Sequence, residues 1–340
     1  MTRATRRAAR PTMVDVARRA RVSLKTVSRV VNRESGVASD TAERVSAAIE
    51  ALSFRRNDGA AHLRRGSTTA SLGVVLMDVA DPFYSALTRA VEEVAISHRF
   101  LVLAGSSDED VDRERELALA LCARRVDGLI VVPAGTDQRY LRAEVGAGTP
   151  VVFVDRPGVG VQADAVLVDN AGGVRAAVEH LAAHGHRRIA FLGDSPAIYT
   201  ARERLRGFGL GMAQVARRGA ASLVEMGPHT PQSVRAALLR FRSERQPATA
   251  LVTGNNRITV LALRALAAIR GWRPALVGFD DLELADLLRP SLSVIEQDAS
   301  ELGRIAAELL FARIAGDRRP FRRVVLPTRL VPRGSGELAP

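Results

Sequence analysis

The chain has 340 residues, of which 47% are hydrophobic, and this length suits two or three domains with sizeable cores. Its single cysteine, Cys122, excludes an internal disulfide framework and a zinc site built from several cysteines. No apolar run approaches the ~20 residues that cross a bilayer, and the basic N-terminus lacks the apolar stretch of a secretory signal. The composition therefore favours a soluble cytoplasmic protein without a membrane partner.

The net charge of +12 is concentrated at the N-terminal end. Residues 1–66 hold 15 basic and 6 acidic side chains, whereas the remaining 274 residues hold 34 basic and 31 acidic ones. This asymmetry indicates a small basic module attached to a nearly neutral body. A module of this charge predicts a polyanionic partner and binding that weakens with salt.

Short amphipathic helices are predicted over residues 12–52. Apolar side chains recur there at spacings of three and four, which places them on one face of each helix. Ser23 is expected to cap the second helix by accepting a hydrogen bond from the backbone N–H of Thr26. Residues 55–71 are polar and basic and are predicted to form a linker.

The second helix, over residues 23–31, carries Lys25 and Arg29 away from its apolar face. A short helix of this kind can enter the DNA major groove, where the two basic side chains reach base edges or phosphates. Thr26, Asn32 and Thr41 are suitable phosphate ligands. The spacing alone fits an ordinary three-helix domain with a solvated basic face equally well.

From residue 72 onward, short apolar runs alternate with amphipathic helical stretches. This alternation is typical of right-handed βαβ units and parallel sheets. Ligands of such sheets bind at the carboxyl ends of the strands. The predicted strands span residues 72–77, 100–104, 128–132, 151–154, 165–168, 189–192, 250–252 and 275–279.

Residues 12–32 resemble the DNA-binding headpiece of the LacI/GalR family of bacterial transcriptional regulators. The motifs at 81–84, 126–130, 184–192 and 278–281 resemble the effector domain of the same family. The resemblance implies an all-α helix-turn-helix headpiece joined by a hinge to an α/β domain. That domain is expected to be periplasmic-binding-protein-like, with two parallel-sheet subdomains.

The resemblance also implies the domain boundaries. The headpiece is expected over residues 1–56, with a flexible basic tail over 1–10, and the hinge over 57–69. The effector-binding and dimerisation domain is expected over 70–335. Its first subdomain would comprise about 70–163 plus 297–321, and its second about 164–296 plus 322–335.

The family's DNA contacts transfer position by position. The implied base-reading residues are Leu24, Lys25 and Arg29. The implied backbone contacts are Thr12, Ser23, Thr26, Ser28, Asn32 and Thr41. In the hinge, Ala60 matches a small residue that lets two hinges approach, and Leu63 matches a leucine wedge for the minor groove. An ordinary linker residue is the alternative for Leu63.

Two headpiece positions depart from the family pattern. Arg21 stands where the family has a glycine in the turn, and Ala38 stands where it has the serine that begins the third helix. Ser39 is a candidate substitute for that cap. Both departures affect turn geometry and leave the base-reading positions unchanged.

The resemblance places the effector in a cleft between the two subdomains. The implied binding residues are Phe83, Tyr84, Asp155, Arg204, Asn255 and Asp280. Their carboxylates, amide and guanidinium suit vicinal hydroxyls, and the aromatic rings suit stacking on a sugar ring or a base. Core packing is the alternative for the two aromatic residues, and an ion pair between strand ends is the alternative for Arg204 and Asp280.

A sugar is favoured over a purine as the effector. Ile198 and His229 stand where the purine-sensing branch of the family has an arginine and an aromatic stacker. His180, His184 and His186 have a spacing that metal ligands use, but they match a structural turn of the family. No metal and no cofactor are therefore predicted.

The sequence predicts a homodimeric, cytoplasmic and nucleoid-associated repressor of carbohydrate-uptake or catabolic genes. It would bind a palindromic operator in double-stranded DNA and respond to a small molecule, a sugar. A non-sugar effector or corepressor, such as a nucleoside, a purine or a partner phosphoprotein, is the alternative within the family. The headpiece disfavours a transport protein, and the lack of a recognisable nucleophile–base pair disfavours an enzyme.

Overall fold

The computed structural model describes residues 11–32, 34–55, 69–215 and 223–340. The chain divides into two compact units, Met1–Thr69 and Ala70–Pro340, which we call the headpiece and the body. Among the described residues, no helix is both long enough and apolar enough to span a membrane.

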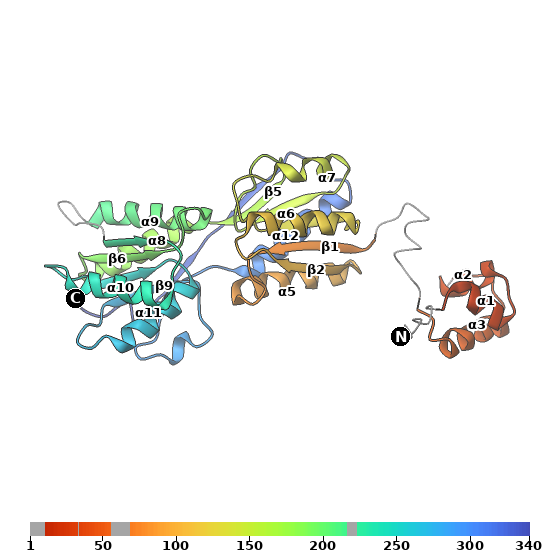
Figure 1. Cartoon of the computed structure of the whole chain (residues 1–340), viewed down its shortest axis with the longest axis horizontal. Coiled ribbons are helices and arrows are strands. Elements are labelled where there is room, and N and C mark those ends of the chain that lie inside the picture. The colour runs from red at the N-terminus through yellow and green to blue at the C-terminus, as the bar shows by residue number, and fades with distance from the viewer. Residues whose placement is uncertain (1–10, 33, 56–68, 216–222) are drawn as a thin grey trace, which may run out of the picture. The chain divides into compact units, whose positions relative to one another are not determined.

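The described part of the headpiece contains α1 (Met13–Ala20), α2 (Leu24–Val31) and α3 (Ser39–Ala51), as predicted (Figure 1). Ser23 Oγ accepts from the backbone N–H of Thr26 at 3.1 Å, which confirms the predicted cap of α2. The helices enclose a small core of valine and alanine side chains. Its buried members are Val16, Ala17, Ala20, Val27, Val45 and Ala48.

The two unusual headpiece positions behave differently. Arg21 adopts a φ of 53°, so the turn keeps the left-handed conformation that a glycine would take at lower cost. The prediction that Ser39 caps α3 is wrong. Ala38 has the extended N-cap backbone, while Ser39 is already the first helical residue and its hydroxyl donates to Glu43 Oε1 at 3.3 Å.

The body is built around two mostly parallel sheets of six described strands each. The first sheet has the order β11-β5-β4-β3-β1-β2 and the second has the order β12-β10-β9-β8-β6-β7, with only β12 antiparallel to its neighbour. The first sheet comprises β1 (Ser71–Leu76), β2 (Leu101–Ser106), β3 (Gly128–Val131), β4 (Val151–Val154), β5 (Asp164–Val168) and β11 (Arg323–Leu326). The second comprises β6 (Ile189–Gly193), β7 (Leu223–Met226), β8 (Ala250–Thr253), β9 (Ala275–Phe279), β10 (Ser293–Glu296) and β12 (Arg329–Val331).

Helices cover both faces of each sheet (Figure 1). On the first sheet, α5 and α12 pack on one face and α6 on the other. On the second sheet, α10 and α11 pack on one face and α8 and α9 on the other. The helices of the body are α5 (Pro82–Ser97), α6 (Val111–Ala123), α7 (Arg142–Gly146), α8 (Asn170–Ala183), α9 (Tyr199–Val215), α10 (Pro231–Ser243), α11 (Asn256–Ala268) and α12 (Ala299–Ile314).

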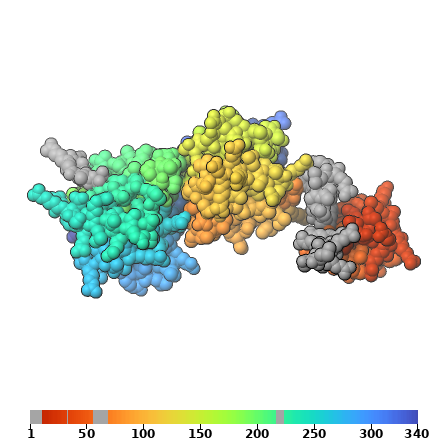
Figure 2. Space-filling view, in the orientation of Figure 1, coloured from red at the N-terminus to blue at the C-terminus, as the bar shows by residue number. Residues whose placement is uncertain are grey.

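The predicted subdomain boundaries at 163 and 322 are wrong by one strand each. β5 pairs with β4 and β11 in the first sheet, in register with Val324 opposite Val166. The buried carboxylate of Asp164 at the start of β5 binds Arg313 of α12 at 2.7 Å, which ties β5 to a helix of that sheet. The chain therefore crosses between subdomains after 168, 296 and 326. Figure 2 shows the two subdomains as separate lobes.

Candidate functional site

The reading face of α2 is exposed. Val27 anchors the helix in the headpiece core, whereas Leu24 is 47% exposed and Lys25 and Arg29 are also exposed. The structure therefore leaves all three predicted base-reading side chains free to approach a groove. Ala60 and Leu63 lie outside the described residues, so the predicted hinge contacts remain predictions.

The predicted backbone contacts lie at helix ends. Ser23 and Thr26 lie at the N-terminus of α2, with their hydroxyl oxygens 2.8 Å apart, where helix dipole and free N–H groups favour a phosphate. Asn32, at the other end of α2, donates to Ser28 Oγ at 3.3 Å. Thr12 precedes α1 and donates its hydroxyl to Asp15, and Thr41 lies in the first turn of α3.

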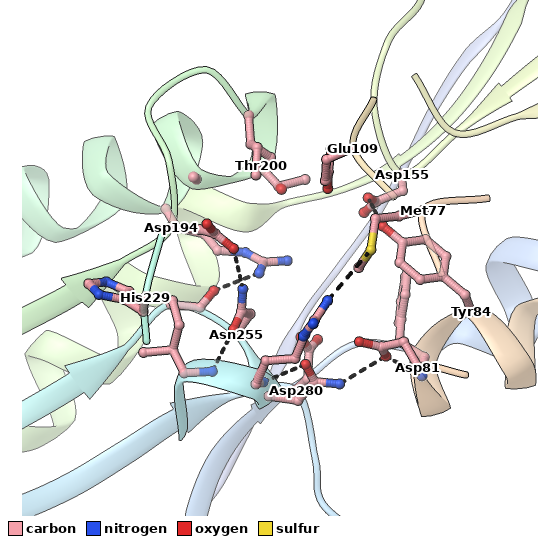
Figure 3. Close-up of a pocket in the computed structure, with 18 of the residues that line it drawn as sticks. Met77, Asp81, Tyr84, Glu109, Asp155, Asp194, Thr200, His229, Asn255 and Asp280 are labelled. Atoms are coloured by element: carbon pink, nitrogen blue, oxygen red, sulfur yellow. Dashed lines mark hydrogen bonds between the residues drawn. The ribbon is translucent and has the colours of Figure 1, made fainter. Parts of the chain in front are cut away.

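The body contains a cavity of about 610 Å³ between its two subdomains (Figure 3). Residues that follow the carboxyl ends of strands in both sheets line it, as the parallel topology predicts. All six predicted effector residues are among its lining residues, namely Phe83, Tyr84, Asp155, Arg204, Asn255 and Asp280.

Asp155 and Asp280 occupy equivalent places in the two subdomains. Asp155 follows β4 with a φ of 67°, and Asp280 follows β9 with a φ of 68°, a left-handed conformation that aspartate tolerates better than most side chains. Both are buried, so each sheet contributes one carboxylate to the cavity. Burial raises the pKa of Asp280, and the Asp81 and Asp155 carboxylates add to this while Arg204 opposes it.

Arg204 is held by neutral partners. Its Nε donates to Asn170 Oδ1 at 2.7 Å, its Nη1 donates to the Gly254 carbonyl at 2.6 Å, and its guanidinium carbon lies 3.7 Å from the centre of the Phe279 ring. Asp280 instead accepts from Gln297 Nε2 at 2.5 Å. The alternative of an ion pair between Arg204 and Asp280 is therefore wrong.

The two aromatic residues both line the cavity and pack in the core. Tyr84 is only 5% exposed, and its hydroxyl donates to Asp155 Oδ2 at 3.1 Å. Phe83 meets the Tyr84 ring edge to face at 4.9 Å between centroids. Burial, with the neighbouring Asp155 charge, raises the pKa of Tyr84 well above its usual value. Tyr84 thus fixes Asp155, and Phe83 supplies apolar wall.

Several polar residues of the cavity escaped the sequence prediction. Asn256 Nδ2 donates to Asp81 Oδ1 at 2.9 Å and so connects the two subdomains across the cleft. Asn255 Nδ2 donates to Asp194 Oδ2 at 2.9 Å, and Gln297 follows β10. Asp194 and Gln297 directly follow or nearly follow strand ends, and that position was the signal that could have revealed them.

The histidines at 180, 184 and 186 hold the C-terminal segment. His180 Nε2 lies 2.5 Å from Glu337 Oε1, and His186 Nε2 lies 2.8 Å from the Leu338 carbonyl. His184 Nδ1 lies 2.9 Å from the His180 carbonyl. In the described ranges, no group of three or more side chains is arranged to hold a metal ion.

Comparison with known proteins places the whole chain. Residues 12–57 match the model for bacterial regulatory proteins of the lacI family, and residues 178–336 match the model for a periplasmic binding protein-like domain. The transcriptional regulator PtxS of Pseudomonas aeruginosa is 34% identical over 333 residues, which cover 96% of each chain. The chain belongs to the lacI family.

Solved structures of lacI-family proteins confirm the fold of this lacI-family chain. The Lac repressor dimer bound to operator and the anti-inducer ONPF superposes with a TM-score of 0.82, at 28% identity, over 97% of this chain and 100% of that one. A complex of the regulator CelR with cellobiose gives a TM-score of 0.70, at 29% identity, over 96% and 100%. The protein is therefore a DNA-binding transcriptional regulator and not an enzyme.

Proposed function

We propose that the protein is a homodimeric repressor of carbohydrate-uptake or catabolic genes that binds a palindromic operator and responds to a sugar in the cleft of the body. The observation that carries this proposal is the cavity, where carboxylates from both sheets and a fixed arginine converge beside an aromatic wall. CelR, in its complex with cellobiose, supports a carbohydrate in the same fold.

The DNA half of the proposal rests on α2. Leu24, Lys25 and Arg29 are exposed and would read base edges, while the predicted backbone contacts fix the register on the phosphates. In the hinge, Leu63 would insert into the minor groove with Ala60 beside it. Two copies related by a two-fold axis read two half-sites, so the operator would be palindromic.

An apolar strip on the first subdomain supports dimerisation. β2 is the edge strand of its sheet and exposes Leu101 by 72% and Leu103 by 39%. Ile96, on the helix α5 that packs against β2, is 69% exposed. A long apolar edge is prone to aggregation unless another element covers it, and a second copy of the chain is the proposed cover.

The effector half rests on hydrogen-bond complementarity. Carboxylates accept from vicinal hydroxyls, and the Phe83 ring offers an apolar surface for the face of a sugar. Ile198 and His229 both line the cavity in place of the groups expected for a purine. Because the Asp81–Asn256 hydrogen bond spans the cleft, a ligand there would favour one arrangement of the two subdomains over another.

Acting on the chromosome places such a repressor in the cytoplasm, and we propose that it associates with the nucleoid. The test is selection of bound sequences from random double-stranded DNA with the full chain, followed by gel shifts with and without sugars. We expect a palindromic site that at least one sugar releases. DNA binding without sequence preference would contradict the proposal, and tighter binding with sugar would instead indicate a corepressor.

A further inference from the structure

The cavity carries more negative than positive groups. Among the described residues that line it, the carboxylates are Asp81, Glu109, Asp155, Asp194 and Asp280, and the guanidinium groups are Arg156, Arg204 and Arg257. An anionic ligand would therefore need a cation that is not already neutralised. The partners of the arginines decide whether the cavity offers one.

Arg156 is fully committed to the protein. Glu109 binds it with both carboxylate oxygens, at 2.6 Å to Nη1 and 2.5 Å to Nη2, and Nη1 also donates to the Pro133 carbonyl at 3.0 Å. Its Nε lies 3.4 Å from Asp155 Oδ2, and its side chain is only 5% exposed. Two carboxylates thus neutralise this guanidinium before any ligand arrives.

The backbone around Glu109 is built to hold it there. Asp108 and Glu109 have φ values of 53° and 61°, so two consecutive residues other than glycine adopt the left-handed region. Such a pair costs conformational free energy and persists only where the surroundings impose it. The Asp108 N–H donates to the Met77 carbonyl at 2.8 Å, and the Asp108 carboxylate pairs with Arg113, which together fix the loop.

The remaining polar groups offer acceptors to a ligand rather than cations. Arg204 is held by Asn170, the Gly254 carbonyl and the Phe279 ring. Gln297 Oε1 is buried and has no hydrogen-bond partner in the described part of the chain. A ligand rich in hydroxyl or ammonium donors would satisfy Gln297 and the carboxylates together.

We propose that the cleft selects a neutral or amine-bearing polyol and rejects sugar acids and sugar phosphates, and that Glu109 sets this charge selectivity by neutralising Arg156. The inference rests on the proposed function, because it names the class of effector for the same cavity. Glu109 acts as a specificity-determining residue through a neighbouring side chain.

The first test is a panel of matched ligands on the full chain, followed by melting temperature and by isothermal titration. For D-ribose, D-galactose, D-glucose and a set of disaccharides, each neutral sugar is compared with its aldonate, its phosphate and, where one exists, its 2-amino form. We expect stabilisation only by neutral or amino members. An aldonate or phosphate that stabilises the protein more than its neutral parent would overturn the inference but leave a sugar-responsive repressor in place. A panel without any stabilising ligand would contradict the proposed function itself.

The second test changes the charge of the cavity. Glu109→Gln keeps the size of the side chain and leaves Arg156 without its main counterion, so affinity for the aldonate of the best sugar should rise by about tenfold or more. Glu225→Gln is the matched control, because Glu225 pairs with Arg240 at 2.5 Å outside the cavity. Adding Arg156→Gln to Glu109→Gln should abolish the gain. An unchanged preference in a Glu109→Gln protein that melts like the wild type would refute the role of Glu109.

Discussion

The headpiece and the body place their functional side chains in opposite ways. The headpiece gathers Leu24, Lys25 and Arg29 on one exposed helix, and none of them is needed for its core. The body gathers its site from strands of two sheets and buries Asp155, Arg204 and Asp280. Recognition of a polyanion thus uses local, solvated charge, whereas recognition of a small ligand uses desolvated groups that distant segments hold in place.

The largest effect is expected in the headpiece. Replacing both Lys25 and Arg29 with alanine should abolish operator preference, because each bidentate base contact contributes about 1–3 kcal/mol of discrimination. Ligand binding by the body should stay unchanged. Footprinting and gel shifts on specific and random DNA measure the first effect, and calorimetric titration measures the second. Retained sequence selectivity would refute the assignment of the reading helix.

The next effect is expected in the cleft. Asp280→Asn keeps the shape of the side chain but removes a buried charge, so effector affinity should fall by about tenfold to a hundredfold. Operator affinity without effector should persist, since Asp280 lies in the body. Asp286→Asn, outside the cavity, is the control. An unaltered titration of Asp280→Asn with the sugar would show that this carboxylate does not bind the effector.

A smaller effect tests whether the two units are separable in stability. Ser23→Ala removes the hydrogen bond that caps α2 and should destabilise the headpiece by about 1 kcal/mol. Amide hydrogen exchange should increase in α1, α2 and α3 and stay the same in the strands of the body. Ser46→Ala, on the exposed side of α3, is the control. Increased exchange throughout the chain would show that the two units unfold together.

The smallest effect concerns pH. His186 is buried, and burial lowers its pKa below the usual value of 6.5. The unfolded state then binds the proton more readily, so the free energy of unfolding of the body should fall as pH drops through about 6.5. The slope is at most about 1.4 kcal/mol per pH unit for one proton. His186→Gln should flatten the pH dependence of urea unfolding, while His98→Gln, on an exposed histidine, should not. Equal slopes in all three proteins would contradict this reading.

The same contrast explains how far sequence reasoning reached. Periodicity and the Ser23 cap are local, and they predicted the headpiece helices directly. Apolar runs predicted the buried strands, but β10 and β11 are short and bordered by polar residues, which hid them and displaced the subdomain boundaries. The Asp81–Asn256 hydrogen bond joins residues 175 positions apart, and Glu109 meets Arg156 across 47 positions. No local pattern encodes such pairs, because the sheet topology creates them.

The central claim is that occupancy of the cleft and affinity for the operator are coupled. Coupling is reciprocal, so the factor by which the sugar changes operator affinity must equal the factor by which the operator changes sugar affinity. The most direct measurement is therefore the dissociation constant of the sugar for the free protein and for the protein–operator complex. We expect weaker sugar binding to the complex, by the same ratio that the sugar imposes on operator binding. Equal affinity of the sugar for both forms would contradict the account.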